Sequence, residues 1–228
     1  MRSMAGPMAD AILSATDVWK TFDGRVDVLR GVNLDVGRGE AVLLWGPNGS
    51  GKTTLLSILG GMDVPTRGSV RLGGREISRL KESELAKVRL HEIGFVFQTH
   101  NLIDDLTVRE NVGLPLRLAR KPREPRVGEL LAAFGLERLA TRHPKEISVG
   151  ESQRVAVARA LANGPNVVLA DEPTAALDAK GTAAVLDAFE RARTAFGASV
   201  VMASHDPEVR AIPATRYALE DGALHRSA

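Results

Sequence analysis

The sequence predicts an α/β fold with a mostly parallel sheet, a small antiparallel β layer and a helical lobe. Three short apolar runs, at 41–45, 167–170 and 199–203, have the composition of strands that are buried on both faces. Helical segments separate these runs, and this alternation favours a parallel sheet covered by helices on both sides. Hairpin patterns occur in the first third of the chain, and one long helical block interrupts the alternation.

The first strands are followed by a glycine-rich loop. Hydrophobic and polar residues alternate over 32–36, as in a half-buried strand. A turn over 37–40 precedes the apolar run 41–45, which has the length of a short buried strand. The loop at 46–53 then leads into a helix that we expect to continue to about Leu59.

A second hairpin and a charged helix come next. Pro65 to Gly68 breaks the chain, and the pattern at 70–77 predicts a hairpin with Gly73-Gly74 at its turn. Together with a hairpin near 12–36, it would form the small β layer. We expect a charged amphipathic helix over 80–90 and the end of another strand at 95–98.

The segment 101–163 is mostly helical in pattern, and we expect it to form a separate lobe. Residues 107–110 and 148–151 both have the Ser/Thr-x-x-Glu form of a capping box, and Gly135 is placed to end a helix. Asp221-Gly222 predicts a terminal hairpin.

We divide the chain into a tail and one domain. Residues 1–11, with three methionines and small side chains, are expected to be a disordered tail or a remnant of cloning. Residues 12–228 would form the domain, with the helical lobe at about 101–163 inserted in its core.

Composition limits the class of protein. The 228 residues are 44% hydrophobic and 25% charged, which is usual for a soluble globular domain. Thirty Lys and Arg against 28 Asp and Glu leave a net charge of +2, which argues against nucleic-acid binding by bulk charge. The absence of Cys excludes disulfides and thiolate metal sites.

No run approaches the ~20 apolar residues of a membrane span, and no secretory signal is recognisable. We therefore expect any membrane role to depend on a partner.

The glycine-rich loop matches the phosphate-binding P-loop pattern, Gly-x-x-x-x-Gly-Lys-Thr. Its glycines let backbone N–H groups converge on phosphates at a helix N-terminus. Lys52 is expected to reach the β- and γ-phosphates, and the Thr53 hydroxyl to bind Mg²⁺. A glycine-rich turn with an incidental lysine is disfavoured by the flanking strand and helix. The predicted nucleotide contacts of this loop are Gly46, Pro47, Asn48, Gly49, Ser50, Gly51, Lys52, Thr53 and Thr54.

Two carboxylates follow the second apolar run. Asp171 would be costly to bury at a strand end unless it were paired or bound to a cation, so it fits as the Mg²⁺ partner of Thr53. Glu172 points to the other side of the chain and suits the polarisation of an attacking water. The alternative is a carboxylate that only caps the next turn, and the P-loop makes this alternative weaker.

Five further features complete a family pattern. The segment 147–154, Ile-Ser-Val-Gly-Glu-Ser-Gln-Arg, resembles the signature motif of ATP-binding cassette (ABC) ATPases, usually LSGGQ followed by a Gln-Arg pair. Gln98 resembles the glutamine of that family's Q-loop, and His205 the switch histidine. Residues 175–178 resemble the D-loop, and Phe22 resembles the aromatic residue that stacks on adenine, with Trp19 as its competitor. Their order across nearly the whole chain makes the resemblance specific.

The resemblance implies a P-loop ATPase in which two subunits meet head to tail around ATP. Catalysis would rest on Lys52, Gln98, Glu172 and His205, and the Mg²⁺ ligands would be Thr53, Gln98 and Asp171. Residues expected to bind nucleotide across the dimer are Ser148, Gly150, Glu151 and Asp178. The implied partners are an integral-membrane permease and a second ATPase subunit, in a homodimer or pseudo-dimer, without nucleic acid. The subunit would lie in the cytoplasm, on the inner face of the cell membrane.

The segments 60–68, 94–98 and 101–112 look like those of exporter-type subunits related to lipoprotein-release and macrolide-export ATPases. Val149 departs from the family pattern, because a glycine usually stands there. The Ser148 capping box predicts that Val149 is the first helical residue, with a negative φ.

Two rival classes have less support. A soluble ABC ATPase of DNA repair or translation usually carries coiled coils, zinc modules or a second cassette, and this chain has no sustained heptads, no Cys and one P-loop. A small-molecule kinase would need neither 147–154 nor His205. The basic run 117–126 fits a solvated face better than a contact with anionic lipid head groups.

Overall fold

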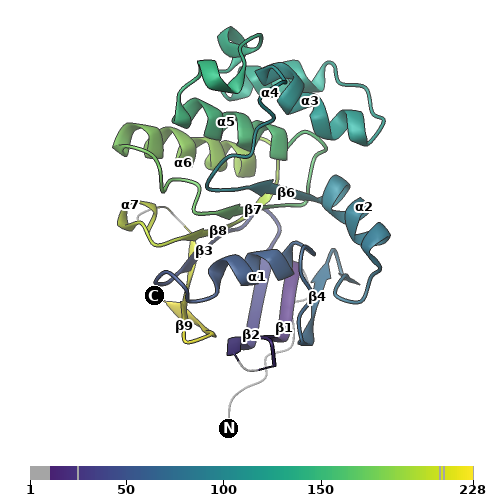
Figure 1. Cartoon of the computed structure of the whole chain (residues 1–228), viewed down its shortest axis with the longest axis vertical. Helices are drawn as coiled ribbons and strands as arrows, with labels where there is room; N and C mark the ends of the chain where they lie inside the picture. Colours follow the sequence, from purple (N-terminus) through teal and green to yellow (C-terminus); the bar gives the residue numbers. More distant parts are fainter. Residues whose placement is uncertain (1–10, 25, 211, 213, 228) are drawn as a thin grey trace.

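The computed structural model describes residues 11–24, 26–210, 212 and 214–227. It contains two sheets and a group of helices (Figure 1). The predicted tail over 1–11 lies outside the described residues, except that Ala11 begins the first strand. Within the described part of the chain, no helix combines the length and the apolar character that crossing a membrane would require.

The smaller sheet is the predicted antiparallel layer. Its strands, in the order β2-β1-β4-β5, are β1 (Ala11–Phe22), β2 (Val26–Gly37), β4 (Arg67–Leu72) and β5 (Arg75–Glu76). Each neighbouring pair is antiparallel, so both predicted hairpin regions are confirmed. The alternation that predicted a half-buried strand is also confirmed, because Val32, Leu34 and Val36 are buried.

The larger sheet has the order β10-β9-β3-β8-β7-β6. Its strands are β3 (Ala41–Trp45), β6 (Ile93–Val96), β7 (Val167–Asp171), β8 (Ser199–Ser204), β9 (Thr215–Glu220) and β10 (Ala223–Ser227). The pairs from β9 to β6 are parallel, and β10 pairs antiparallel with β9 across the Asp221-Gly222 turn. The three predicted apolar strands and the terminal hairpin are therefore confirmed.

One strand end differs from the prediction. The pairing of β6 with β7 stops at Val96, and Gln98 lies in a turn beyond it rather than at the strand end. The next backbone acceptor, Phe97 O, binds the side-chain amide of Gln153 at 2.9 Å instead of a neighbouring strand. Phe97 O also accepts from His100 N at 3.1 Å, so a turn and a side chain from a distant helix both occupy this carbonyl where the strand ends.

The helices are α1 (Lys52–Leu59), α2 (Glu82–Glu92), α3 (Val108–Leu118), α4 (Arg126–Ala133), α5 (Val149–Ala160), α6 (Ala179–Thr194) and α7 (Pro207–Arg210), with 3₁₀ turns at Glu137–Leu139 and Pro144–Glu146. Both predicted capping boxes are present, at the starts of α3 and α5. Gly135, with φ 64°, follows the end of α4 as predicted.

Residues 101–107 are not helical, although they fall in the block expected to be mostly helical. The buried side chain of Asn111 holds this loop: its Oδ1 accepts from Ile103 N at 2.8 Å, and its Nδ2 donates to the carbonyls of Ile103 and Leu106 at 3.0 and 2.9 Å. These bonds replace the backbone bonds that a helix would have made.

The larger sheet lies between two hydrophobic cores. Val42 and Leu44 of β3 pack with α1 and the small β layer, whereas Leu43 packs on the opposite side with α5 and α6. Figure 1 shows this layering, with α1 on one face of the sheet and α6 on the other. A Val or Leu fully buried in such a core stabilises the fold by roughly 1.5–3 kcal/mol, so strands buried on both faces anchor the loops that follow them.

Candidate functional site

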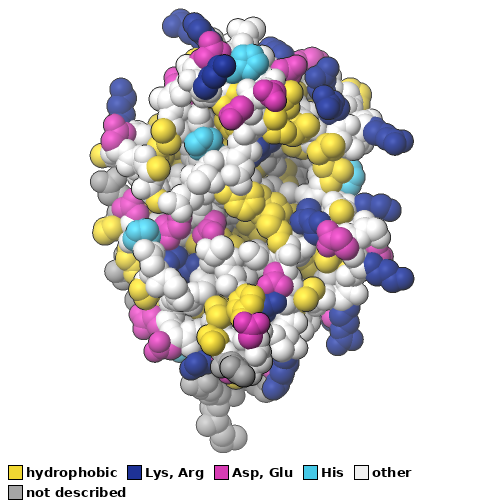
Figure 2. Space-filling view, viewed as in Figure 1, with side chains coloured by type: hydrophobic (Ala, Val, Ile, Leu, Met, Phe, Trp, Pro, Cys, Tyr) yellow, Lys and Arg dark blue, Asp and Glu magenta, His cyan; other side chains and the backbone are white. Residues whose placement is uncertain are grey.

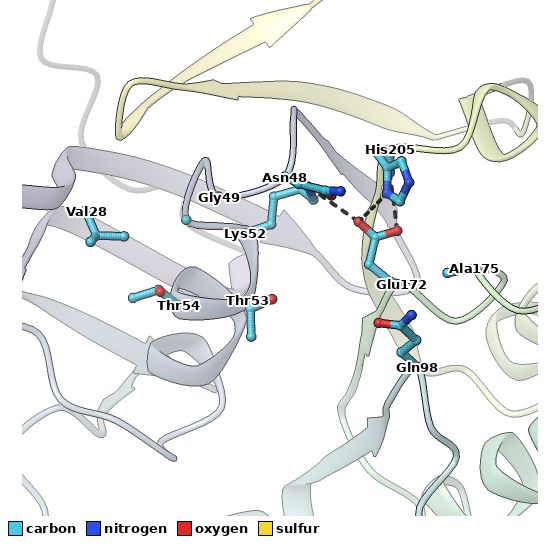
Figure 3. Close-up of a pocket in the computed structure, with 11 residues that line it drawn as sticks. Val28, Asn48, Gly49, Lys52, Thr53, Thr54, Gln98, Glu172, Ala175 and His205 are labelled. Carbon is cyan, nitrogen blue, oxygen red and sulfur yellow. Dashed lines mark hydrogen bonds and ion pairs between the residues drawn. The ribbon is translucent and has the colours of Figure 1, made fainter.

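The candidate site lies at the carboxyl ends of three adjacent parallel strands, where ligands bind in open α/β sheets. The loop after β3, the two carboxylates that end β7, and His205 after β8 meet there. The loop, Glu172 and His205 border a cavity of about 390 Å³ (Figure 3), and Asp171 is not among its lining residues. The cavity is lined by Val28, Asn48, Gly49, Gly51, Lys52, Thr53, Thr54, Gln98, Glu172, Ala175 and His205.

The loop after β3 has the backbone that a phosphate cradle requires. Gly49 and Gly51 have φ values of 82° and 102°, in the region that favours glycine. A Cβ at Gly46 would lie 2.4 Å from the carbonyl oxygen of Leu219, so no other residue fits there without a shift. The α1 helix begins at Lys52, and its free N–H groups therefore face the cavity.

Lys52 is buried and held by the loop itself. Its Nζ donates to the carbonyls of Gly46 and Pro47 at 2.8 and 3.1 Å and lies 3.4 Å from Glu172 Oε1. A buried ammonium with these partners is a fixed positive charge beside a row of loop N–H groups. The arrangement is suited to binding a polyanion.

Glu172 contacts both Lys52 and His205. His205 Nδ1 lies 2.9 Å from Glu172 Oε1, and the backbone N–H of His205 donates to Oε2 at 3.4 Å. The Glu172 backbone has φ 46°, which is strained for this residue, and its N–H donates to Ala203 O at 3.0 Å. In Figure 3, Lys52 reaches Glu172 from α1 while His205 approaches it from the loop after β8.

Asp171 has the properties of a cation ligand. Desolvation by burial raises the pKa of its carboxyl and the neighbouring Glu172 charge adds to this, while the Thr53 hydroxyl and Lys52 lower it. One of its oxygens, Oδ1, is buried without a hydrogen-bond partner. Among the described residues no three acidic, His or Cys side chains form a metal cage. The Asp171 carboxylate and the Thr53 hydroxyl are two oxygen ligands beside the phosphate cradle. This pair fits Mg²⁺, which is usually bound by one or two carboxylates together with substrate phosphates.

Most predicted P-loop and catalytic residues thus converge, although Gly46, Pro47 and Ser50 of the loop do not themselves line this cavity. Five more predicted nucleotide contacts lie outside the loop and do not line the cavity either. Phe22 lies at the end of β1 with 45% of its surface exposed. Ser148, Gly150 and Glu151 lie at the start of α5, and Asp178 caps α6 through a 2.7 Å bond from Gly181 N. The sequence did not indicate Val28, because it reaches the cavity from the small β layer without any local motif.

The segment that resembles the signature motif forms a capped helix start. Ser148 N donates to Glu151 Oε2 at 2.8 Å, and Glu151 N donates to Ser148 Oγ at 3.3 Å. Hydrogen bonds from the Ser148 backbone and hydroxyl lower the pKa of Glu151. Val149 is the first residue of α5, as predicted, and 47% of its surface is exposed. Gly150 lies close to Gly181 at the start of α6.

A second, more apolar cavity of about 210 Å³ lies where α2, α3 and α5 meet β6. Phe95, Phe97, Leu114, Pro115 and Leu118 line it together with Arg89 and Arg159. Figure 2 shows a hollow between the helices of the lobe and α2, with hydrophobic side chains gathered beside it. We call this cavity the lobe groove.

Comparisons with known proteins show which sequences and structures this chain is similar to. A family model described as ABC transporter matches residues 29–175. The lipoprotein-releasing system ATP-binding protein LolD of Geobacter metallireducens is 43% identical, over 93% of this chain and 97% of the relative. The bacitracin export ATP-binding protein BceA of Halalkalibacterium halodurans is 38% identical, over 94% of this chain and 87% of the relative. The ATP-binding cassette MJ0796, solved as a dimer in a post-hydrolysis state with ADP and Pi, has a TM-score of 0.84 at 40% identity and covers 94% of this chain and 97% of that one.

Proposed function

The chain belongs to the ABC transporter family, and we propose from this premise that it hydrolyses ATP to drive an export permease in the cell membrane. The observation that carries the proposal is the contact of Glu172 with both Lys52 and His205 at the mouth of a phosphate cradle. The names of the relatives, a lipoprotein-releasing system and a bacitracin exporter, support the direction of transport.

The proposed roles follow from charge and position. The loop N–H groups and Lys52 bind the β- and γ-phosphates, and their fixed charges stabilise the negative charge that develops during transfer. Glu172 orients the attacking water and accepts its proton, while His205 holds the Glu172 carboxylate in place. Mg²⁺ would be held by Thr53, Asp171 and Gln98, and when bound it offsets the charge of the phosphates. The products are ADP and phosphate.

We propose that a second subunit completes the site. Ser148, Gly150 and Glu151 begin a helix, so the Gly150 N–H group and the α5 dipole suit a phosphate, yet these residues do not line the cavity of their own chain. Asp178 begins the neighbouring helix α6. The dimeric state in which the cassette MJ0796 was solved with ADP and Pi supports a head-to-tail pair in which each chain contributes these residues to its partner's ATP.

The lobe groove is the proposed contact for the permease. Its apolar lining suits one face of an amphipathic helix, and the loop 101–107 beside it exposes Asp104 and Asp105. The subunit would then be held at the inner face of the membrane by its permease, because no described helix is suited to spanning the bilayer.

Charge reversal tests the coupling. The double variant Asp104→Lys, Asp105→Lys should impair co-purification with the permease, or permease-stimulated turnover, more than it impairs basal ATPase activity. The matched control reverses Glu129 and Glu137, which are exposed on the same lobe but lie outside the loop 101–107. Equal loss of basal and stimulated activity in the first variant would contradict the proposed contact and point to misfolding or a free-standing ATPase.

A further inference from the structure

Helix α5 holds the loop that carries Gln98 at three carbonyl oxygens. The amide of Gln153 donates to Phe97 O at 2.9 Å. One turn and a half further along α5, the Arg159 guanidinium donates to His100 O at 2.8 Å and to Asn101 O at 2.6 Å. We call Gln153 and Arg159 the α5 clamp.

The clamped loop has a backbone that would not persist without support. His100 and Asn101 are consecutive non-glycine residues with φ values of 44° and 47°. Left-handed backbone is unfavourable for L-residues, and two such residues in a row are held only where the surroundings over-determine the conformation. The carbonyls of these same two residues are the ones that Arg159 binds. The clamp is therefore placed to fix the strained turn.

Both clamp residues are committed to this contact. Gln153 is 1% exposed, so its amide has little access to water. Burial lowers the pKa of the Arg159 guanidinium, and no carboxylate lies within ion-pair distance of it in the part of the chain that the structure describes. A partly buried Arg usually pairs with a carboxylate. Here its donors are directed at loop carbonyls instead.

The clamp also joins two parts of the site. Gln98, between Phe97 and His100, lines the nucleotide cavity. The other end of the clamp is α5 itself, which has Ser148 as its N-cap and rises as one rigid element by about 1.5 Å per residue. We infer that Gln153 and Arg159 are positioning residues that hold Gln98 in the cavity, so that α5 sets the placement of Gln98. This inference rests on the role proposed for Gln98.

Substitution of Arg159 tests the inference. Arg159→Met keeps the apolar stem and removes the donors, whereas Arg159→Lys keeps one charged donor group. Arg159→Met should lower kcat by about tenfold or more, as expected for a misplaced catalytic group. The KM for ATP should stay within about twofold, because the phosphate cradle is untouched. The Mg²⁺ concentration for half-maximal rate should rise, and Arg159→Lys should recover part of the lost rate.

The matched control is Arg126→Met. Arg126 also donates to a backbone carbonyl in the helical lobe, Leu161 O at 3.0 Å, but does not contact the Gln98 loop. Amide hydrogen exchange over 99–103 should be faster by about tenfold or more in Arg159→Met, the factor expected when a hydrogen bond to a charged group is lost, and unchanged in Arg126→Met. Equal changes in both variants would refute the clamp, because they would show a general loosening of the lobe.

A double-mutant cycle with Gln98→Ala separates the role of the α5 clamp from the role of Gln98 itself. If the clamp acts through Gln98, Arg159→Met should cause no further loss of kcat in the Gln98→Ala background. Additive losses would overturn the inference. Full turnover of Gln98→Ala alone would refute the role of Gln98 and the inference with it, whereas a slow Gln98→Ala beside a fully active Arg159→Met would refute the clamp alone.

Discussion

The imidazole of His205 and the carboxylate of Glu172 lie 2.9 Å apart, although they follow different strands and are separated by 33 positions in the chain. The Glu172 oxygen in this pair also lies 3.4 Å from Lys52 Nζ. A carboxylate held between two basic groups keeps one orientation toward the cavity. For this reason we propose that Glu172, and not the neighbouring Asp171, polarises the attacking water.

Glu172→Gln should retain ATP binding and lose nearly all turnover, because an amide of the same shape cannot accept the proton of the attacking water. The inactive protein should accumulate as an ATP-bound dimer. Size-exclusion chromatography with Mg-ATP, together with a phosphate-release assay, measures both effects. Turnover within about threefold of the wild type would remove Glu172 from this role, since general-base catalysis contributes more than that.

Phe22→Ala should weaken ATP binding by roughly tenfold, because stacking of a base on an aromatic ring is worth about 1–3 kcal/mol. The Phe22 ring is exposed at the end of β1, with the Lys20 ammonium 5.0 Å from its centroid. Trp19 is instead engaged with Asp17, to which its Nε1 donates at 2.8 Å. Nucleotide titration by calorimetry compares the two: if Trp19→Ala weakens ATP binding and Phe22→Ala does not, the assignment is wrong.

Val149→Gly should increase ATP-driven dimerisation, because the exposed isopropyl group of Val149 lies at the first turn of α5, where we propose that the partner's nucleotide binds. The cost in helix stability should be about 0.5 kcal/mol or less. Ser148→Arg should abolish turnover while leaving ATP binding to the monomer unchanged. Analytical ultracentrifugation with and without ATP tests this pair, and a Val149→Gly protein that dimerises no better would contradict the steric account.

The two capping boxes allow a matched test of Glu151 against Glu110. Hydrogen bonds from the capping Ser148 and Thr107 lower the pKa of both carboxyls. Because the folded-state pKa is depressed, each carboxylate stabilises the fold above its unfolded pKa, and this stability is lost as the pH falls through the folded pKa. Glu151→Ala and Glu110→Ala should therefore both lower Tm at pH 7, and the differences from the wild type should shrink only once the pH falls below the unfolded-state pKa of the carboxyl.

Dimerisation separates the two variants. Glu151 lies at the proposed composite site and Glu110 lies at the start of α3. Only Glu151→Ala should weaken the ATP-bound dimer, when both are measured in the Glu172→Gln background. An equal effect of both variants on dimerisation would mean that Glu151 acts through fold stability alone.

The elements that follow from local pattern could be predicted from the sequence. The run 41–45 became β3 without a shift, because a short apolar segment between a turn and a glycine loop has few other structures available. The capping box at 148–151 predicted the N-terminus of α5 and, with it, the placement of Val149 in the helix. In each case the residues that decide the structure are neighbours in the chain.

Features that depend on distant contacts could not be predicted. The strand before Gln98 ends at Val96, where a side chain from α5 and the N–H of His100 bind the carbonyl of Phe97. The loop 101–107 is shaped by Asn111, which from sequence alone is an ordinary polar residue inside a helix. Val28 enters the cavity because the small β layer packs against the glycine loop. The roles of Phe22, Ser148, Gly150, Glu151 and Asp178 in binding nucleotide remain predictions.

The strand order of the larger sheet has a consequence for folding. β3, β8 and β7 are adjacent, but they come from opposite ends of the chain, so the phosphate loop, the two carboxylates and His205 meet only after long-range pairing is complete. Folds with such non-local pairings form slowly. Only the fully folded protein should therefore bind nucleotide. Saturating ATP should raise the midpoint of global denaturation rather than protect one segment of the chain. A fragment that ends before β8 should have no measurable affinity for nucleotide.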